Sequence, residues 1–455
     1  MNAPSPKLNL FDLTMIVISL VIGMGIFRTA SDTAQAALTP SIYFGSWIAG
    51  GLAALCGALT YAEIGSRFPV TGGYYKIFAE CYHPSVAFAI NCIILISNAA
   101  SLSGIALVGA EYLVQAFFTQ PATDFTKALI AMAALVAFYL VNLAGLRLSS
   151  KTQNVLMLMK IGMILVLLSG LFFPAKFQSP TAAATAASIG WLDYLKSFGF
   201  ALIAVSFTYG GYQQTINFGD EIKTPRKTIP RGIMLGITVI IALYLLVQVV
   251  YFKVIGFEEL KTSRGIAAIV VEKLYGPTAK YVFSLFLFTA VLAYVNVLLL
   301  SNPRVMYAMS LDGILPAPFK TKNQKRDVVT VSLTVFTAIC IVVLFFANTF
   351  QQILGFAIFL DSIGMATSAA TIFILRKRTR HLDGTGIYQM KLYPLMPLIF
   401  IAAYLFVGAS ILISTPRLAL TGLGVFAFFL LTYFLTRKFR TPSKPVNVTR
   451  SLSKQ

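Results

Sequence analysis

The sequence predicts an all-α integral membrane protein with twelve transmembrane helices, ten of them arranged as two inverted five-helix repeats. Hydrophobic residues make up 57% of the 455 residues and charged residues only 11%, and a soluble domain could not cover so much apolar surface. Long apolar runs recur along the whole chain. Two glycine clusters, Gly23-Met24-Gly25 and Gly210-Gly211, interrupt apolar runs at matching places in the two halves.

Each predicted span is an apolar run long enough for a membrane-crossing helix, which needs ~20 residues. The runs are residues 11–38, 42–66, 84–118, 127–146, 153–174, 190–219, 232–255, 277–310, 328–347, 350–375, 392–414 and 417–436. The glycine clusters break the first and the sixth. A short surface helix is expected over 266–274. Residues 1–10 contain one lysine and no small-residue cleavage site, so we expect no removable signal peptide.

The expected domain organisation is one membrane domain, residues 1–440, followed by a disordered tail at 441–455. Within the domain, one repeat covers about 11–174 and the other about 190–376, each with five spans that begin with a broken helix. Because five is odd, the second repeat would insert with inverted orientation. The spans in 392–436 fall outside the repeats.

The formal net charge of +20 could indicate a nucleic-acid-binding protein, but its distribution indicates membrane orientation. Dense Lys/Arg runs at 320–326, 376–380 and 437–440 all fall on one side of a twelve-helix topology. This positive-inside pattern predicts that both termini are cytoplasmic, in the cell (inner) membrane. Contact with anionic membrane lipids is expected at that face, and nucleic-acid binding is not.

The helix breaks carry the predicted chemistry. A break at mid-membrane depth exposes backbone groups where almost no water is present, so it is tolerated where those groups line a cavity or bind a ligand. The half-helix that starts near Ile26 would offer N–H groups and a positive dipole end to a carboxylate. Carbonyls near Val21 and Ile22, and near Phe207 and Thr208, would accept hydrogen bonds from an ammonium.

Together these groups predict a receptor for an α-amino acid zwitterion, built mainly from backbone atoms. The residues expected to bind this substrate are Val21, Ile22, Gly23, Met24, Gly25, Ile26, Phe207, Thr208, Tyr209, Gly210 and Gln213. The alternative is that the glycines are packing contacts between helices. Their matching positions in the two halves favour the binding interpretation.

Four groups of residues carry a family resemblance, in order over residues 8–377. They are Val21-Ile22-Gly23-Met24-Gly25-Ile26-Phe27, residues 61–64 with 68–74, residues 207–212 with 220–226 and 229–231, and residues 304–309 with 312–316. These motifs resemble the amino acid–polyamine–organocation (APC) superfamily, most closely its L-type amino acid transporter branch. The resemblance implies a secondary carrier of amino acids with the APC/LeuT-like fold, sodium-independent and working by alternating access.

The resemblance also assigns roles to two side chains. It implies that Phe207 closes over the substrate as an aromatic gate, although core packing is the ordinary role of a phenylalanine. Lys160 matches the fifth-helix lysine of the L-type and proton-coupled branches, where the ammonium lies beside the unwound first helix in place of a sodium ion. It could be a structural tether or a proton carrier. Snorkelling to the interface is the alternative for a lysine at this depth.

Other polar residues inside the spans are candidates for positions beside the substrate or at the gates. They are Asn98, Tyr294, Asn296 and Asp361. Asp361 is unusual for the family, and Lys160 or Arg28 could pair with it. Near the inner face, Glu63 is expected to tether a basic loop. The charges of Arg67, Arg304 and Asp220 are expected to form gating or structural ion pairs.

Small or medium neutral L-amino acids are the default substrate, because the unwound segments offer no obvious acidic partner for a cationic side chain. Proton symport and amino-acid exchange both stay open. The alternatives are an amino-acid sensor on a transporter scaffold, or a carrier of polyamines or other amines. No enzyme is expected, because no Ser/His/Asp, HExxH or carboxylate-pair motif defines a site.

No cofactor or metal is expected. The cysteines Cys56, Cys81, Cys92 and Cys340 have no metal-binding spacing and are interpreted as packing residues. L-type carriers of animals use a cysteine between spans 3 and 4 to bond an accessory glycoprotein. Residues 119–126 contain no cysteine, so we expect no disulfide-linked accessory subunit.

Overall fold

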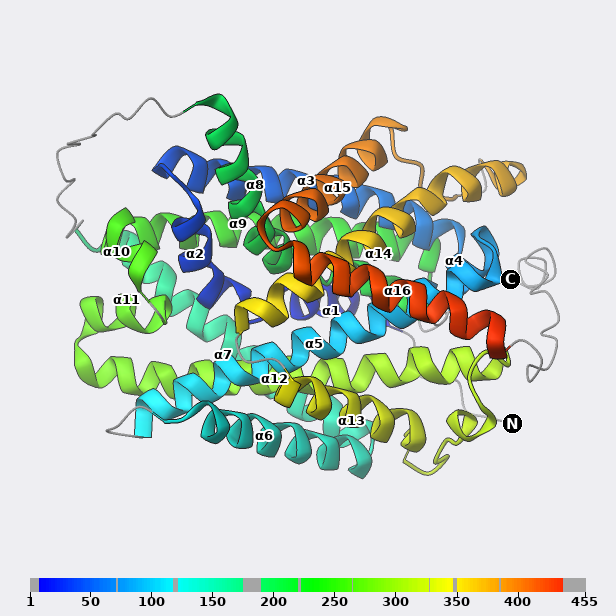
Figure 1. The fold of residues 1–455 in the computed structure, drawn as a ribbon, viewed down its shortest axis with the longest axis horizontal. Helices are drawn as coiled ribbons and strands as arrows, with labels where there is room; N and C mark the ends of the chain where they lie inside the picture. The colour runs from blue at the N-terminus through cyan, green and yellow to red at the C-terminus, as the bar shows by residue number, and fades with distance from the viewer. Residues whose placement is uncertain are drawn as a thin grey trace.

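The structure, a computed structural model, is a bundle of long helices (Figure 1). It describes residues 8–70, 73–117, 122–174, 190–219, 222–263, 265–326, 328–346, 350–383 and 386–436. The predicted tail at 441–455 and the basic run at 437–440 lie outside these described residues, as does Asp220.

The first predicted span is two helices, α1 (Leu10–Val21) and α2 (Gly25–Ala36), bent by 42° at the glycine cluster. The other predicted spans correspond to α3 (Pro40–Arg67), α5 (Pro84–Phe117), α6 (Asp124–Ala144), α7 (Leu146–Leu168), α8 (Trp191–Tyr209), α9 (Pro225–Ile255), α12 (Pro277–Leu311), α13 (Thr330–Phe346), α14 (Phe350–Arg378), α15 (Leu395–Ser414) and α16 (Pro416–Thr436). Shorter helices are α4 (Gly73–Cys81), α10 (Phe257–Thr262) and α11 (Ile266–Tyr275).

The all-α membrane class is confirmed. In the described ranges, 9 helices are long and apolar enough to cross a membrane, and the bent pair α1–α2 makes a tenth. The helix α13 is a shorter apolar helix, and α8 carries Asp193 and Lys196 in its first two turns. The count of twelve therefore stays a prediction, although every predicted span contains a helix.

Helix starts follow local sequence signals. Asn9 caps α1, because its Oδ1 accepts a hydrogen bond from the N–H of Asp12 at 2.9 Å while the Asp12 carboxylate accepts one from the N–H of Asn9 at 3.0 Å. Proline occupies the first position of α3 and α9, where a missing N–H costs nothing. These local signals set where the chain turns from loop to membrane helix.

The second break differs from the expected pattern of two half-helices. After α8 the chain continues as a short 3₁₀ helix, η2 (Tyr212–Asn217), instead of a second membrane half-helix. Gly211 has φ +119°, a backbone conformation that glycine adopts without steric cost, and α8 cannot continue through it. The segment before α1 is tied to the chain beyond η2, because the N–H of Lys223 donates to the carbonyl of Leu8 at 3.2 Å.

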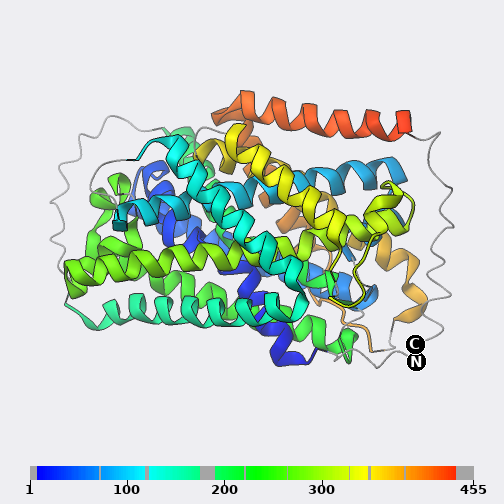
Figure 2. The same ribbon diagram turned by 90° about the horizontal axis from the view of Figure 1, so that it is seen from below.

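Burial separates a central set of helices from the periphery. In α5, 78% of the apolar stretch is buried, against 11% in α16, which lies along the outer edge of the bundle (Figure 2). The expected surface helix over 266–274 is α11, but its residues Ile266, Ala267 and Val270 are buried against the bundle. Exposed leucines and phenylalanines on α16 suit a lipid-facing position.

Candidate functional site

The two glycine breaks pack against one another. A Cβ added at Gly25 would lie 2.9 Å from Oγ1 and 3.0 Å from Cα of Thr208 on α8. A Cβ added at Gly211 would lie 2.3 Å from the carbonyl oxygen of Leu20 on α1. The glycines therefore act as packing contacts, and this close packing brings the backbone groups of the two breaks together.

A pair of threonines joins α2 to α8 at the same place. The hydroxyls of Thr29 and Thr208 are 2.6 Å apart, and Thr29 also hydrogen-bonds to the carbonyl of Gly25 at 2.8 Å. Both side chains are buried. Thr208 was predicted from the sequence, whereas Thr29 was not. Thr29 could have been identified as a hydroxyl residue one turn after Gly25, on the same face of the helix.

Lys160 is fully buried, and its Nζ donates to the carbonyl oxygen of Ile22 at 2.8 Å. A second contact between α7 and α1 lies about two turns from Lys160, where Nε2 of Gln153 donates to the hydroxyl of Ser19 at 3.2 Å. The ammonium thus contacts the unwound segment, instead of reaching back along the helix toward the interface.

Two tyrosines of α9 donate hydrogen bonds to backbone carbonyls around the first break. The carbonyl oxygen of Val21 accepts from the Tyr244 hydroxyl at 3.0 Å and from the N–H of Gly23 at 2.7 Å, so both of its lone pairs are used. The carbonyl of Ile26 accepts from the Tyr251 hydroxyl at 3.2 Å. Neither tyrosine was predicted from the sequence. The one local sign is that they are seven residues apart within an apolar span, which places them on the same face of a helix.

The start of α2 presents the donor side of the break. The N–H of Phe27 donates to the carbonyl of Met24 at 3.1 Å, whereas the N–H groups of Gly25 and Ile26 precede the first intrahelical bonds. The side chains of Met24 and Ile26 are buried. A bound carboxylate would therefore meet backbone N–H groups within an apolar surrounding.

Residues of the second break contribute in different ways. Phe207 is partly exposed on the last turn of α8, and its carbonyl accepts from the N–H of Gly210 at 3.3 Å. The Tyr209 ring packs on Trp47 and Tyr244, with centroid separations of 6.0 and 5.2 Å, so its side chain points away from the break. The Oε1 of Gln213 accepts from the N–H of Gly211 at 2.8 Å and holds the unwound loop.

Of the polar candidates on the flanking helices, Tyr294 reaches the first break. Its ring lies 3.4 Å from the position that a Cβ on Gly23 would take, and its hydroxyl is 2.9 Å from that of Ser101. Asn98 donates to Asn302 at 2.7 Å and joins α5 to α12. These two contacts place α5 and α12 along one side of the break.

Asn296 lies elsewhere, in a network between α6, α7 and α12. Its Oδ1 accepts from Asn142 at 2.9 Å and from Ser149 at 3.0 Å, and its Nδ2 donates to Gln153 at 3.0 Å. Because Gln153 also bonds Ser19, this network positions α7 against α1 and acts on the break only through that helix.

Asp361 on α14 hydrogen-bonds with the hydroxyl of Ser97 at 2.8 Å. Neither of its expected partners reaches it: Lys160 bonds Ile22, and Arg28 pairs with Glu111 at 3.3 Å. The Asp361 carboxylate thus links α14 to α5 through this hydrogen bond.

One end of the bundle is closed by an ionic cluster around Glu63. This fully buried carboxylate pairs with Arg67 and with Arg376, each at 2.7 Å, and accepts from the N–H of Met390 at 2.9 Å. Arg67 further pairs with Asp383 at 3.0 Å. These bonds tie the end of α3 to the end of α14 and to the segment that follows it. Arg304, in contrast, bonds within its own helix, to the carbonyl of Leu300 at 3.0 Å.

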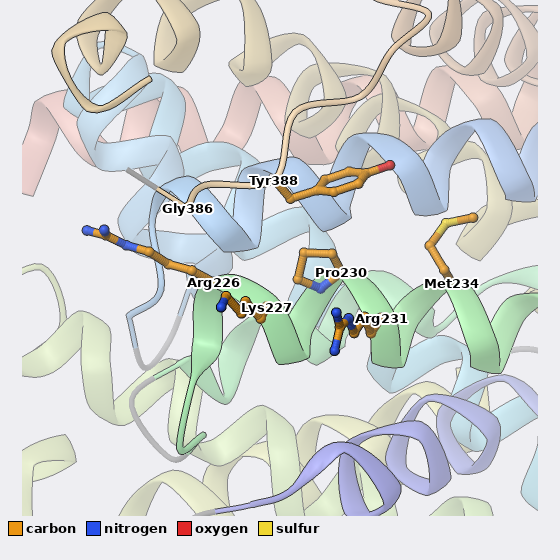
Figure 3. Close-up of a pocket in the computed structure, with 7 residues that line it drawn as sticks. All are labelled: Arg226, Lys227, Pro230, Arg231, Met234, Gly386 and Tyr388. Atoms are coloured by element: carbon orange, nitrogen blue, oxygen red, sulfur yellow. The ribbon is translucent and has the colours of Figure 1, made fainter. Parts of the chain in front are cut away.

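A cavity of about 330 Å³ lies between the first turns of α9 and the segment 386–388 (Figure 3). It is lined by Arg226, Lys227, Pro230, Arg231, Met234, Gly386 and Tyr388, none of which belongs to either break. The Ser66 hydroxyl links its two walls, since it donates to the carbonyl of Arg226 and accepts from the N–H of Tyr388, both at 2.9 Å. Three of the lining residues are cationic, although the surface that lines the cavity is mainly apolar.

Comparison with known proteins adds independent findings. The sequence profile of the amino acid permease family matches residues 8–436. The serine/threonine exchanger SteT of Bacillus subtilis is 26% identical over 410 residues, which cover 89% of this chain and 90% of that protein. The mouse b(0,+)-type amino acid transporter 1 is 24% identical over 446 residues, which cover 95% of this chain and 89% of that protein. The rabbit large neutral amino acids transporter small subunit 2 is 24% identical over 434 residues, which cover 92% of this chain and 78% of that protein.

Proposed function

Because the chain belongs to the amino acid permease family, we propose that it carries small or medium neutral L-amino acids across the cell membrane by alternating access, without sodium. The membership confirms the expectation of an APC-type amino acid transporter, a multi-pass membrane protein that is not an enzyme. The proposal concerns the substrate class, the ion dependence and the mechanism.

The observation that carries the proposal is the contact between the two breaks. The N–H groups of Gly25 and Ile26 would bind the substrate carboxylate, because they begin a helix inside the membrane. The ammonium would bind the last carbonyls of α8, near Phe207 and Thr208, because the Ile22 carbonyl already accepts from the Lys160 ammonium, which would repel a second cation there. The Val21 carbonyl would contribute structurally, since it already accepts two hydrogen bonds.

Sodium independence is supported by Lys160. Its ammonium donates to a carbonyl of the unwound segment, which is where a bound metal cation would find its ligands. A fixed ammonium at that position removes the need for a metal ion and repels one electrostatically.

The neutral substrate class is supported by the side chains around the break. Met24, Phe207 and Tyr294 are apolar or aromatic, and the lysine beside them is engaged with Ile22. Relatives named as a serine/threonine exchanger and as a large neutral amino acid transporter favour the same class, and the first favours exchange as one coupling mode. Proton symport is the other.

Orientation and partners complete the proposal. Both termini would be cytoplasmic, since the basic runs at 320–326 and 376–380 would then obey the positive-inside rule. We expect no disulfide-linked accessory subunit, because all four cysteines are buried thiols. A reducible heavy complex on a non-reducing gel would contradict this.

The test is uptake of radiolabelled amino acids into liposomes that contain the purified protein. Empty vesicles, vesicles preloaded with amino acids and vesicles with an inward proton gradient are compared, each in sodium and in choline buffers. Equal uptake of neutral amino acids in both buffers is expected. Sodium-dependent uptake would contradict the assigned role of Lys160. Binding without flux would favour a sensor, and movement of polyamines alone would favour an amine carrier.

A further inference from the structure

One carboxylate inside the bundle has no cationic partner. Asp361 is eleven residues from Phe350, the first residue of α14, which places it about 16 Å along that helix, near the middle of a ~30 Å hydrocarbon layer. Within the part of the chain that the structure describes, no lysine, arginine or histidine pairs with it. An intramembrane carboxylate of this kind is costly when ionised and marks a functional position.

Among the described residues, tyrosines from four helices are close enough to act electrostatically on Asp361. They are Tyr61 on α3, Tyr74 on α4, Tyr294 on α12 and Tyr404 on α15. Tyrosine hydroxyls donate or accept hydrogen bonds but carry no charge near neutral pH. The carboxyl group therefore lies among neutral tyrosines, and neither of its charge states is compensated by an ion pair.

Ser97 provides a hydrogen bond for each charge state. Its hydroxyl lies 2.8 Å from Oδ1 of Asp361 and 2.9 Å from the carbonyl oxygen of Ala357. When the carboxylate is ionised, the hydroxyl donates to Oδ1. When the acid is protonated, the hydroxyl donates to Ala357 and accepts from the acid, so the Ser97 hydroxyl keeps a hydrogen bond with the carboxyl group in either state.

A short series of contacts joins this carboxylate to the candidate substrate site. Ser97 and Ser101 are one turn apart on α5, so they share a face of that helix. The Ser101 hydroxyl is 2.9 Å from that of Tyr294, and the Tyr294 ring packs on Gly23 in the first break. The Asp361 side chain is partly buried and is not sealed within the packed core.

We propose that Asp361 binds and releases the proton coupled to amino acid transport, with Ser97 as the hydroxyl that positions the carboxyl group in both charge states. The proposal rests on the proposed function and decides one point that it left open. It makes the carrier a proton symporter and makes Lys160 a fixed cation. Only a proton is transferred, from water to the carboxylate and back.

The experiment uses the full-length protein in liposomes with a pH-sensitive dye trapped inside. Counterflow of a radiolabelled neutral amino acid and substrate-dependent internal acidification are measured on the same vesicles. The wild type is expected to show both. Asp361→Asn is expected to keep counterflow and to lose acidification, and its uptake should no longer rise as the external pH falls. Asp124→Asn, at an exposed carboxylate that is 86% accessible, is the matched control and should behave as the wild type.

Each other result overturns the assignment. Acidification by Asp361→Asn at the wild-type level would mean that another group carries the proton. Loss of counterflow in a folded Asp361→Asn would mean that this residue binds substrate. Wild-type counterflow without acidification would make the carrier an exchanger, whereas no counterflow at all would overturn the proposed function and this inference with it.

A second variant covers the case in which Asp361→Asn does not fold. Ser97→Ala keeps the carboxylate but removes the hydrogen bond that stabilises its ionised form. The external pH that gives half-maximal uptake is expected to shift upward, because the protonated acid becomes relatively more stable. An unchanged pH profile in folded Ser97→Ala would remove Ser97 and its contact from the coupling mechanism.

Discussion

The Nζ of Lys160 lies 2.8 Å from the carbonyl oxygen of Ile22, at the residue where α1 stops being helical. A buried ammonium thus satisfies a carbonyl that the broken helix leaves without an intrahelical partner. The contact joins α7 to the break, so movement of one element alters the other.

Replacing Lys160 should impair transport through this contact. In Lys160→Met the Ile22 carbonyl loses its buried donor, which costs about 1–3 kcal/mol. We expect uptake to fall by about fivefold to about a hundredfold, since every ~1.4 kcal/mol corresponds to a factor of ten. If the lysine is a fixed cation, residual uptake keeps the wild-type pH profile. A flat profile would instead make Lys160 the proton carrier. Lys151→Met, on the exposed face of α7, is the control.

The contact between the breaks predicts the effect of a single methyl group. Gly25→Ala would force a Cβ to within 3.0 Å of the Thr208 backbone, and overpacking of this kind costs about 1–3 kcal/mol. We expect lower thermal stability and loss of uptake. Gly45→Ala on α3, where a Cβ would meet nothing within 4 Å, should leave both unchanged. Normal uptake by Gly25→Ala would show that the breaks need not pack this closely.

The partly exposed position of Phe207 predicts a defect in transport without a defect in folding. Phe207→Ala should raise the KM for uptake, because the occluded state loses its aromatic cover, while the melting temperature stays near the wild-type value. Phe198→Ala, on the same helix but packed on Phe406 at a centroid separation of 6.3 Å, should lower stability more than it alters KM. Unchanged kinetics in Phe207→Ala would remove the gate assignment.

The Glu63 cluster predicts a large effect of neutralising one buried carboxylate. Glu63→Gln leaves Arg67, 1% exposed, without its nearest counter-ion, and breaking a buried pair of this kind costs about 3–5 kcal/mol. The melting temperature in detergent should fall by several degrees. Glu258→Gln, which breaks an exposed pair with Lys261, should have no measurable effect. Equal melting temperatures for the two variants would argue against the cluster as a stabilising element.

A cationic cluster at the start of α9, formed by Arg226, Lys227 and Arg231, predicts selective retention of anionic phospholipid. Arg231→Glu reverses one of its charges, so the purified protein should retain less anionic lipid, as measured by native mass spectrometry. High salt should weaken retention in the wild type, because the contact is partly exposed. Arg417→Glu, in the first turn of α16, serves as the control. Equal lipid retention in both variants would assign the binding to general surface charge.

Several site residues could be identified from the sequence, but their partners could not. Gly25 and Gly211 were identifiable because glycine within an apolar run is a local signal. Tyr244 and Tyr251, which donate hydrogen bonds to carbonyls of the first break, could not be identified from the sequence. An aromatic residue in a membrane helix has many possible neighbours. Asn296 was expected near the site and lies in a separate network, because its position depends on the rotation of α12.

The membrane class, the approximate positions of the helices and the positions of the two breaks could be predicted from local sequence signals. Hydropathy, capping residues and glycine act within one turn of the chain, so they can be read without knowing any neighbour. Three contacts could not be predicted in this way: Lys160 bonds Ile22, Tyr209 packs on Trp47, and Asp361 bonds Ser97 instead of a cation. Those contacts depend on the rotation and register of whole helices, which are set by the simultaneous packing of many side chains.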